Sequence, residues 1–330
     1  MPGLAATGDI YTVEEPVEAP RLSLFPVSLN SAKGHMYARL CTIWDNIEVN
    51  VINFPEENQS LDYARLCPNM TVPVLEIHDK IICDSNLLQK YLSTHYPGPG
   101  DVAAKGRQEA FIDKLKGWDE GLFTYRRMGS MGAIANDLRI VRLHQALKQA
   151  LDAGEGDEEL LDGSTVLDKY IWKIAQIHHL KEATSGEITP ELEKKIAANE
   201  ALTKDMFATA SDLLSRSSGS FLFSDDLCSA DGFLCAIVFR IEQSDPELSA
   251  KYHEDFPAIA EYWEEFKETD EAKCILPYTM SWAKSNALSH GIPFKILGMK
   301  TCIVAPPALP DDVEERIQEE VDRFRDEYTK

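Results

Sequence analysis

The sequence contains little that would carry it into or across a membrane. No stretch reaches the roughly 18 consecutive apolar residues of a membrane-spanning helix, and the longest late candidate, residues 292–309, is interrupted by lysines and prolines. The opening residues, MPGLAATGDIYTVEEPVEAP, are acidic and lack both the basic start and the apolar core of a secretory signal. We therefore expect a cytoplasmic protein without a membrane span.

Cysteine is sparse, and basic charge is outnumbered by acidic charge. The seven cysteines are odd in number and scattered, with no Cys-x-x-Cys pair, which indicates a reducing compartment and not a disulfide framework. The 33 Lys and Arg residues face 55 Asp and Glu residues, giving a formal net charge of −22. A surface of this sign repels nucleic acid and anionic membranes, so we expect neither as a partner.

Motifs of several common catalytic classes are also missing. The chain has no glycine-rich phosphate loop and no Gly-x-Ser-x-Gly elbow. His178, His179 and His253 lack the spacing and the neighbouring cysteines of a metal site. The acidic run at 157–159 lacks the oxygen-ligand spacing of a calcium loop. We therefore expect no metal cofactor.

The hydrophobic pattern predicts a small α/β domain at the start of the chain. Residues 1–20 are expected to be a flexible leader, limited by two prolines. Residues 21–98 follow the order β-α-β-α-β-β-α, with strands marked by apolar alternation and a hairpin around His78 and Asp79.

Beyond residue 100 the periodicity is helical throughout. Residues 105–289 predict an all-helical domain, with a long insertion at about 130–200. Residues 111–125 follow helical spacing, and further helices are expected over residues 134–152, 166–182, 190–216, 231–242, 257–269 and 276–288. Residues 290–330 are expected to be a proline-rich linker and a final amphipathic helix. The apolar stripe of that helix favours docking on the parent domain, with a partner or a second copy as the alternative.

Val72-Pro73 and Asp84-Ser85 are the pairs that point to ligand binding. Proline inside an apolar strand pattern suits an edge strand or a cis peptide bond, and a cis bond would leave the main-chain N–H and C=O of Val72 free for an extended ligand. Asp84 and Ser85 open a helix, whose start offers free amides and a partial positive charge. An α-amino acid would find Ser85 and the amides for its carboxylate and Asp84 for its ammonium. The alternative is that Asp84 and Ser85 only cap the helix.

These residues resemble the glutathione-site segment of the cytosolic glutathione transferases. The resemblance is carried by Cys67-Pro-Asn-Met-Thr-Val-Pro-Val-Leu75 and Ile82-Cys-Asp-Ser-Asn-Leu-Leu-Gln-Lys-Tyr-Leu92. Cys67 stands for the usual Asn, and Met70 for the usual Gly. The resemblance implies the glutathione-transferase architecture, a thioredoxin-like α/β N-terminal domain plus an all-α substrate domain. It also implies glutathione as co-substrate without a metal, bound by Val72, Pro73, Asp84 and Ser85.

The resemblance also implies which serine hydroxyl activates the glutathione thiol. In serine-type transferases the first Ser of a Ser-x-x-Ser run at the start of the first helix donates its hydroxyl to the glutathione sulfur, and Ser28 matches that position. Ser31 is the second choice. A hydroxyl donor and a helix N-terminus both favour thiolate over thiol. The alternative is that Ser28 only caps the helix. Because no cysteine stands here, transfer, addition or dehalogenation is favoured over deglutathionylation.

Parts of the helical domain resemble particular classes of the family. Residues 111–124 and 260–265 are similar to the tetrachlorohydroquinone-dehalogenase-like class, and the long insertion is similar to that of the ganglioside-induced differentiation-associated relatives. Cys228 stands where the family has a capping Ser or Thr, so Ser229 or Asp226 is expected to replace it. The electrophile is expected between the domains, with Trp118, Tyr125 and Arg126 as wall residues. Each of these has an alternative, as a core aromatic or an exposed charge.

The sequence thus predicts a serine-type glutathione transferase acting in detoxification as a homodimer. Its substrate would be a small hydrophobic electrophile, attacked by conjugation or reductive dehalogenation. Two alternatives stay open: a non-catalytic scaffold or adaptor with the same fold, and a specialised glutathione-dependent isomerase or ether-cleaving lyase.

Overall fold

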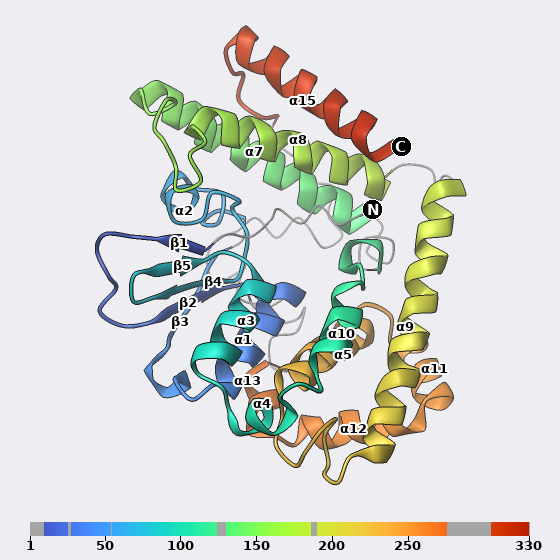
Figure 1. Cartoon of the computed structure of the whole chain (residues 1–330). Helices are drawn as coiled ribbons and strands as arrows, with labels where there is room; N and C mark the ends of the chain where they lie inside the picture. The colour runs from blue at the N-terminus through green and yellow to red at the C-terminus, as the bar shows by residue number, and fades with distance from the viewer. Residues whose placement is uncertain are drawn as a thin grey trace.

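The N-terminal domain of the computed structural model is built on one mixed sheet (Figure 1). The structure describes residues 10–25, 28–53, 55–123, 130–185, 190–275 and 305–329. The strand order is β1-β5-β4-β2-β3, in which β2 runs parallel to β3 and antiparallel to β4. The elements are β1 (Ile10–Thr12), β2 (Arg21–Leu24), α1 (Leu29–Leu40), the 3-10 turn η1 (Trp44–Asn46), β3 (Glu48–Val51), α2 (Leu61–Leu66), β4 (Val74–Ile77), β5 (Lys80–Ile82) and α3 (Ser85–His95).

Alternation along the strands places a different apolar cluster on each face of this sheet. Leu75 and Ile82 are fully buried on the face covered by α1 and α3. Val74 and Ile81, one residue out of step, pack on the opposite face with Tyr63 of α2. Because successive strand residues point to opposite faces, the sheet is covered by helices on both sides. This is the predicted thioredoxin-like arrangement.

Residues 10–12 correct the expectation of a flexible leader over residues 1–20. They form β1, which pairs antiparallel with β5 through Ile10↔Ile82 and Thr12↔Lys80. The Nζ of Lys80 also donates a hydrogen bond to Thr12 Oγ1 at 2.7 Å. The physical reason is that β5 would otherwise present an unpaired strand edge, which the short β-favouring segment Ile-Tyr-Thr covers.

The elements described after residue 98 are helices, apart from one isolated β-bridge. They are α4 (Pro99–Ala104), α5 (Glu109–Lys116), α7 (Ser130–Ala153), α8 (Val166–Ser185), α9 (Pro190–Arg216), α10 (Ser229–Ser244), α11 (Pro246–Asp255), α12 (Pro257–Lys267), α13 (Asp270–Ile275) and α15 (Asp311–Thr329). α9 confirms the helix predicted over 190–216, whereas α4, α11 and α13 have no counterpart among the expected helices. The helix expected over 276–288 lies outside the described residues. No helix in the described ranges is long and apolar enough to cross a membrane.

The buried start of α10 is closed by a reciprocal cap. The carboxylate of Asp231 accepts hydrogen bonds from the main-chain N–H of Cys228 at 2.9 Å and from its Sγ at 3.0 Å. Ser229 is engaged elsewhere, since its Oγ donates to Asp101 at 2.9 Å. The expectation that Ser229 or Asp226 replaces Cys228 is therefore wrong, because the thiol itself holds the capping position.

Helices α7, α8 and α15 form a three-helix layer above the N-terminal domain (Figure 1). α7 and α8 are antiparallel neighbours, and α15 lies along α8 although the two are far apart in sequence. The apolar stripe of α15 is buried against this pair, with exposures of 3–5% at Val313, Ile317, Val321 and Phe324. The stripe therefore docks on the parent chain, the alternative that the sequence favours.

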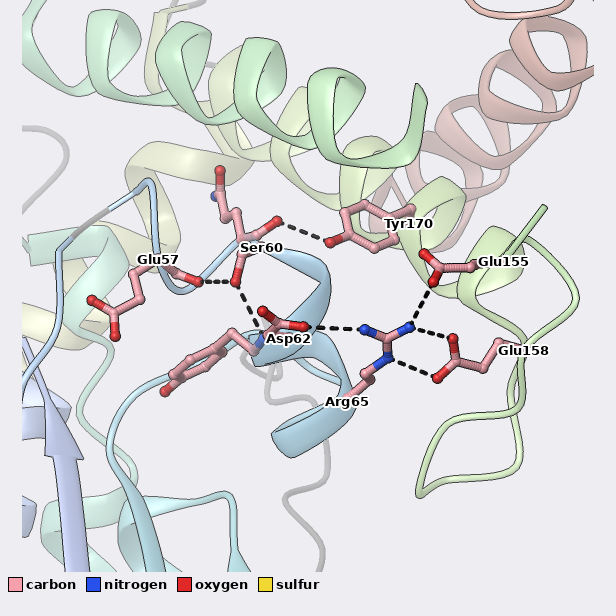
Figure 2. Close-up of polar contacts among 9 residues, drawn as sticks. Glu57, Ser60, Asp62, Arg65, Glu155, Glu158 and Tyr170 are labelled. Carbon is pink, nitrogen blue, oxygen red and sulfur yellow. Dashed lines mark hydrogen bonds and ion pairs between the residues drawn. The ribbon is translucent and has the colours of Figure 1, made fainter. Parts of the chain in front are cut away.

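A fork of ion pairs ties α2 to the loop between α7 and α8 (Figure 2). Nε and Nη2 of Arg65 donate to the two carboxylate oxygens of Glu158 at 2.8 and 2.6 Å, and Nη2 lies 3.3 Å from Glu155 Oε1. Beside the fork, the hydroxyl of Tyr170 donates to the main-chain oxygen of Gln59 at 2.9 Å. A bidentate pair fixes direction as well as distance, so this junction orients the three-helix layer on the N-terminal domain.

Candidate functional site

The N-termini of α1 and α3 meet at one edge of the N-terminal domain. Ser28 is the N-cap of α1, and its hydroxyl accepts a hydrogen bond from Ser31 N at 3.4 Å. Asp84 is the N-cap of α3 and accepts from the amides of the first turn at 2.8 and 2.9 Å. Ser85 Oγ donates to Asn30 Oδ1 at 3.3 Å and so links the two helix starts. Two partial positive helix ends therefore lie close together, an arrangement that favours anionic groups.

Val72 and Pro73 lie beside this pair of helix starts. The Val72-Pro73 peptide is cis. Pro73 packs directly on α1, because a Cβ at Gly34 would lie only 2.6 Å from Pro73 Cγ. The close approach explains a glycine in the middle of a helix, where it is about 1 kcal/mol less favourable than alanine. Of the predicted glutathione contacts, Asp84 and Ser85 therefore open α3, while Pro73, joined to Val72 by the cis peptide, packs on α1 at Gly34.

The three carbonyls that precede Val72 are each held by a side chain. Lys173 Nζ of α8 donates to Asn69 O at 2.7 Å, Asn58 Nδ2 donates to Met70 O at 3.2 Å, and the Tyr63 hydroxyl donates to Thr71 O at 2.9 Å. We call residues 69–71 the carbonyl loop. Two of its supports come from the N-terminal domain, and the third comes from the three-helix layer.

Met70 takes a backbone conformation that side chains rarely adopt. Its φ is +49°, in the left-handed region that favours glycine, which accounts for the Gly that the family pattern has here. The Met70 side chain is 1% exposed and packs in the apolar cluster of the three-helix layer. The free energy gained by burying this side chain thus offsets the less favourable backbone conformation of Met70.

Lys173 is a buried cation that the sequence analysis missed. Its side chain is 2% exposed, and burial lowers its pKa to about 7, with the Arg139 guanidinium acting in the same direction. The signal that could have found it is its place on a helix face with Tyr170 and Ile177, both fully buried. A lysine at such a core position requires a polar partner, and the partner is the carbonyl loop.

The two candidate hydroxyls differ in their surroundings. Ser31 is fully buried, and its Oγ accepts a hydrogen bond from Phe25 N at 3.0 Å. Ser28 is half-buried and accepts one N–H, so its own proton remains available for an acceptor outside the helix. Geometry therefore favours Ser28 over Ser31 as a donor to a ligand.

A second buried cation lies where the two domains meet. Lys33 of α1 is 5% exposed, and its Nζ lies 4.2 Å from the centre of the Phe233 ring of α10. Burial lowers the pKa of Lys33 to about 8, while Glu120 and Asp84 act in the opposite direction. Glu120 is also paired with Arg240 of α10 at 3.0 Å. The domain junction therefore carries charges of both signs close to the N-cap of α3.

The predicted wall of the electrophile site is described only at Trp118. This indole is 6% exposed, its N–H donates to Thr203 Oγ1 at 3.0 Å, and its ring lies 5.3 Å from that of Phe123. Trp118 thus packs in the helical core, and its role as a wall residue stays a prediction. Tyr125 and Arg126 lie outside the described residues. Within the described segments, no group of His, Cys, Asp or Glu side chains is arranged to hold a metal ion.

Comparison with known proteins identifies the N-terminal domain. Residues 22–100 match the family model described as glutathione S-transferase, N-terminal domain. This segment contains β2 to α3 and therefore both helix starts, the carbonyl loop and Val72-Pro73. No curated protein sequence matches the chain.

Solved structures align with the chain at low sequence identity. The β-etherase LigF from Sphingobium sp. strain SYK-6 aligns with a TM-score of 0.50 and 12% identity, over 79% of this chain and 100% of LigF. Gtt2 from Saccharomyces cerevisiae gives 0.47 and 11%, over 77% and 99% of the two chains. The Bombyx mori glutathione transferase BmGSTD1 gives 0.42 and 17%, over 80% and 91%. The family model thus identifies residues 22–100 as similar to the N-terminal domain of glutathione S-transferases.

Proposed function

We propose that this protein is a serine-type glutathione transferase that activates the glutathione thiol for attack on a small hydrophobic electrophile. The observation that carries the proposal is the meeting of two capped helix starts beside Val72-Pro73, joined by the Ser85–Asn30 hydrogen bond. We place its activity in detoxification in the cytoplasm, as a homodimer. Its class would be close to the tetrachlorohydroquinone-dehalogenase-like transferases, with residues 21–98 binding glutathione and residues 105–289 binding the electrophile.

In this proposal the γ-glutamyl end of glutathione binds at the start of α3. Ser85 and the first amides of that helix take its carboxylate. Asp84 uses Oδ1 for both amide hydrogen bonds, and no described residue hydrogen bonds to its Oδ2. That oxygen is available to the α-ammonium group, while the extended peptide pairs with the main chain of Val72.

Ser28 then stabilises the thiolate. A hydroxyl donor and the positive end of α1 both favour the charged form of the sulfur, which lowers the thiol pKa toward neutrality. The thiolate attacks an electrophilic carbon, in a conjugation or as the first step of a reductive dehalogenation. Because Ser28 is not a cysteine, it forms no mixed disulfide with glutathione.

Substitution of Ser28 tests this mechanism. We expect Ser28→Ala to bind glutathione within a few-fold of the wild type but to lose about 100-fold or more in kcat with a generic aromatic halide, as for loss of one donor to a developing anion. Thr165→Ala is the matched control, because Thr165 Oγ1 also accepts an amide at a helix start, that of Asp168 at 3.1 Å. Equal kcat in Ser28→Ala and the wild type would refute the role of Ser28 and direct attention to Ser31.

The second candidate function is a non-catalytic scaffold, and the three-helix layer is the observation that favours it. α7, α8 and α15 share one apolar cluster that reaches the N-terminal domain. These helices enlarge the protein, but none of their described residues lies at the starts of α1 and α3, where glutathione is proposed to bind. Calorimetry with glutathione separates the candidates. Absence of binding at millimolar glutathione favours the scaffold. Binding without turnover of an aromatic halide favours a specialised isomerase or ether-cleaving lyase.

A further inference from the structure

Two buried thiols flank the segment that contains the carbonyl loop and Val72-Pro73. Cys67 is the C-cap of α2, and Cys83 follows β5 and directly precedes Asp84. Their exposures are 0% and 2%. Both side chains lie in the apolar cluster between the sheet and α2. A bond between them would therefore close a loop that contains Val72 and Pro73.

The contacts place both thiols beside the same short segment, residues 66–71. Cys67 Sγ lies 3.7 Å from both Oγ1 and O of Thr71, and Cys83 Sγ lies 3.8 Å from Leu66 O. The Thr71 hydroxyl in turn donates to Cys83 O at 3.5 Å. Leu66 directly precedes Cys67, so the Cys83 sulfur lies against the end of α2 that carries Cys67. Two thiols with these shared neighbours in one cluster can form a disulfide when their sulfurs approach to the 2.05 Å of an S–S bond.

The surroundings favour ionisation of one of the two. The hydrogen bond from Cys83 lowers the pKa of the Cys67 thiol, and Thr71 and the Lys173 ammonium act in the same direction against burial. Elsewhere burial raises the pKa of Cys41 to about 11 and holds those of Cys228 and Cys235 well above the ordinary value. Because thiolates and not thiols react with peroxides, the contrast singles out Cys67.

We propose that Cys67 and Cys83 are an oxidation site that hydrogen peroxide converts into a disulfide. The Cys67 thiolate attacks one peroxide oxygen, the O–O bond breaks, and hydroxide leaves and takes a proton to become water. The resulting Cys67 sulfenic acid is attacked by the Cys83 sulfur, which forms the S–S bond and releases a second water. Two thiols are thereby oxidised while one peroxide is reduced to two waters. Two molecules of glutathione reverse the bond and leave as glutathione disulfide.

The disulfide is expected to alter glutathione binding, a consequence that rests on the proposed function. Residues 68–82 connect the two cysteines and include Val72 and Pro73, while Asp84 is covalently next to Cys83. Drawing the sulfurs together moves the end of α2 toward the start of α3. The spacing between Val72 and the Asp84-Ser85 pair then changes, and we expect glutathione affinity to fall several-fold.

Peptide mapping of the full chain tests the oxidation site. The reduced protein is treated with hydrogen peroxide, denatured in an alkylating agent and digested for mass spectrometry. We expect a peptide pair linked through Cys67 and Cys83, with Cys228 and Cys235 recovered as alkylated thiols. Recovery of Cys67 and Cys83 as alkylated thiols at every peroxide concentration that leaves the protein folded would overturn the proposal.

Single substitutions test the order of the two steps. In Cys83→Ser the Cys67 sulfenic acid has no resolving thiol, so we expect dimedone to label Cys67. In Cys67→Ser we expect no label on Cys83. Cys235→Ser is the control, because it removes a thiol of the helical domain that donates a hydrogen bond to the Tyr262 hydroxyl. It should form the Cys67–Cys83 link as the wild type does. Labelling of Cys83 in Cys67→Ser, with none of Cys67 in Cys83→Ser, would show that the assignment of Cys67 as the attacking sulfur is wrong.

Calorimetry with glutathione on the reduced and oxidised wild type tests the coupling separately. Several-fold weaker binding by the oxidised form supports it, and equal affinity of the two forms refutes it. Failure of the reduced form to bind glutathione would remove the proposed function. The peptide mapping would still test the disulfide independently.

Discussion

Replacing Lys173 by methionine should make the protein more stable near neutral pH while weakening glutathione binding. The ammonium is fully enclosed, and burial lowers its pKa from 10.5 to about 7. At about 1.4 kcal/mol per pKa unit, holding a lysine here costs the native state about 4 kcal/mol at pH 7. Methionine fills a similar volume without that cost. It leaves Asn69 O without its 2.7 Å donor, which costs about 1–3 kcal/mol. The net expectation at pH 7 is a gain of about 1–3 kcal/mol.

The sign of the pH dependence distinguishes this explanation from simple repacking. The native pKa lies below the unfolded value, so between about pH 7 and 10.5 the unfolded chain binds more protons. Wild-type stability therefore rises with pH in that window, while Lys173→Met has no such contribution. The advantage of the variant should shrink by about 2 kcal/mol between pH 7 and 9.

Denaturant unfolding at pH 7, 8 and 9 measures this difference, with glutathione calorimetry on the same samples. Lys169→Met is the matched control, because it removes a lysine one turn earlier on α8 whose Nζ lies 2.6 Å from Asp162 Oδ2 and not at the carbonyl loop. A Lys173→Met variant that is less stable than wild type by the same amount at all three pH values would refute the reasoning. Unchanged glutathione affinity would show that the carbonyl loop does not need this donor.

Two further predictions concern packing. Gly34→Ala should lower stability by about 1–3 kcal/mol through overpacking, because its Cβ would lie 2.6 Å from Pro73. This loss outweighs the better helix propensity of alanine. The melting temperature and the glutathione affinity should both fall, and an unchanged melting temperature would contradict the contact. Phe324→Ala should destabilise the chain by about 3–5 kcal/mol. The reason is that this ring is 4% exposed and its centre lies 6.2 Å from those of both Trp172 and His179. Urea unfolding measures the loss, and a change within about 0.5 kcal/mol, typical of surface positions, would show that α15 is not anchored there.

Local signals account for what the sequence predicted well. The caps Ser28 and Asp84 and the helix α9 each depend on residues within a few positions of one another. The three-residue strand β1 was missed because its pattern is too short and its partner, β5, lies far along the chain. Periodicity identifies Trp118 as one side of a helical pattern, but it cannot tell whether that side meets a ligand or, as here, Thr203.

The support of the carbonyl loop could not be predicted for the same reason. Lys173 and Asn69 are 104 positions apart, and the sequence around either residue does not indicate that the two are in contact. The departures at Cys67 and Met70 were visible in the sequence. Their meaning depended on the fold, which buries the Met70 side chain and places Cys67 and Cys83 in one apolar cluster.

The docking of α15 on α8 also affects the order in which parts of the chain become buried during synthesis. A ribosome releases the N-terminal domain first, so Val72 and both helix starts emerge long before Lys173. The face of α8 opposite that domain stays open until α15 has been made, because Val313 to Phe324 are what cover it. A translating chain thus carries the ligand-binding segment well before it carries the helix that covers α8. The interval between the two is when a nascent chain would most need a chaperone.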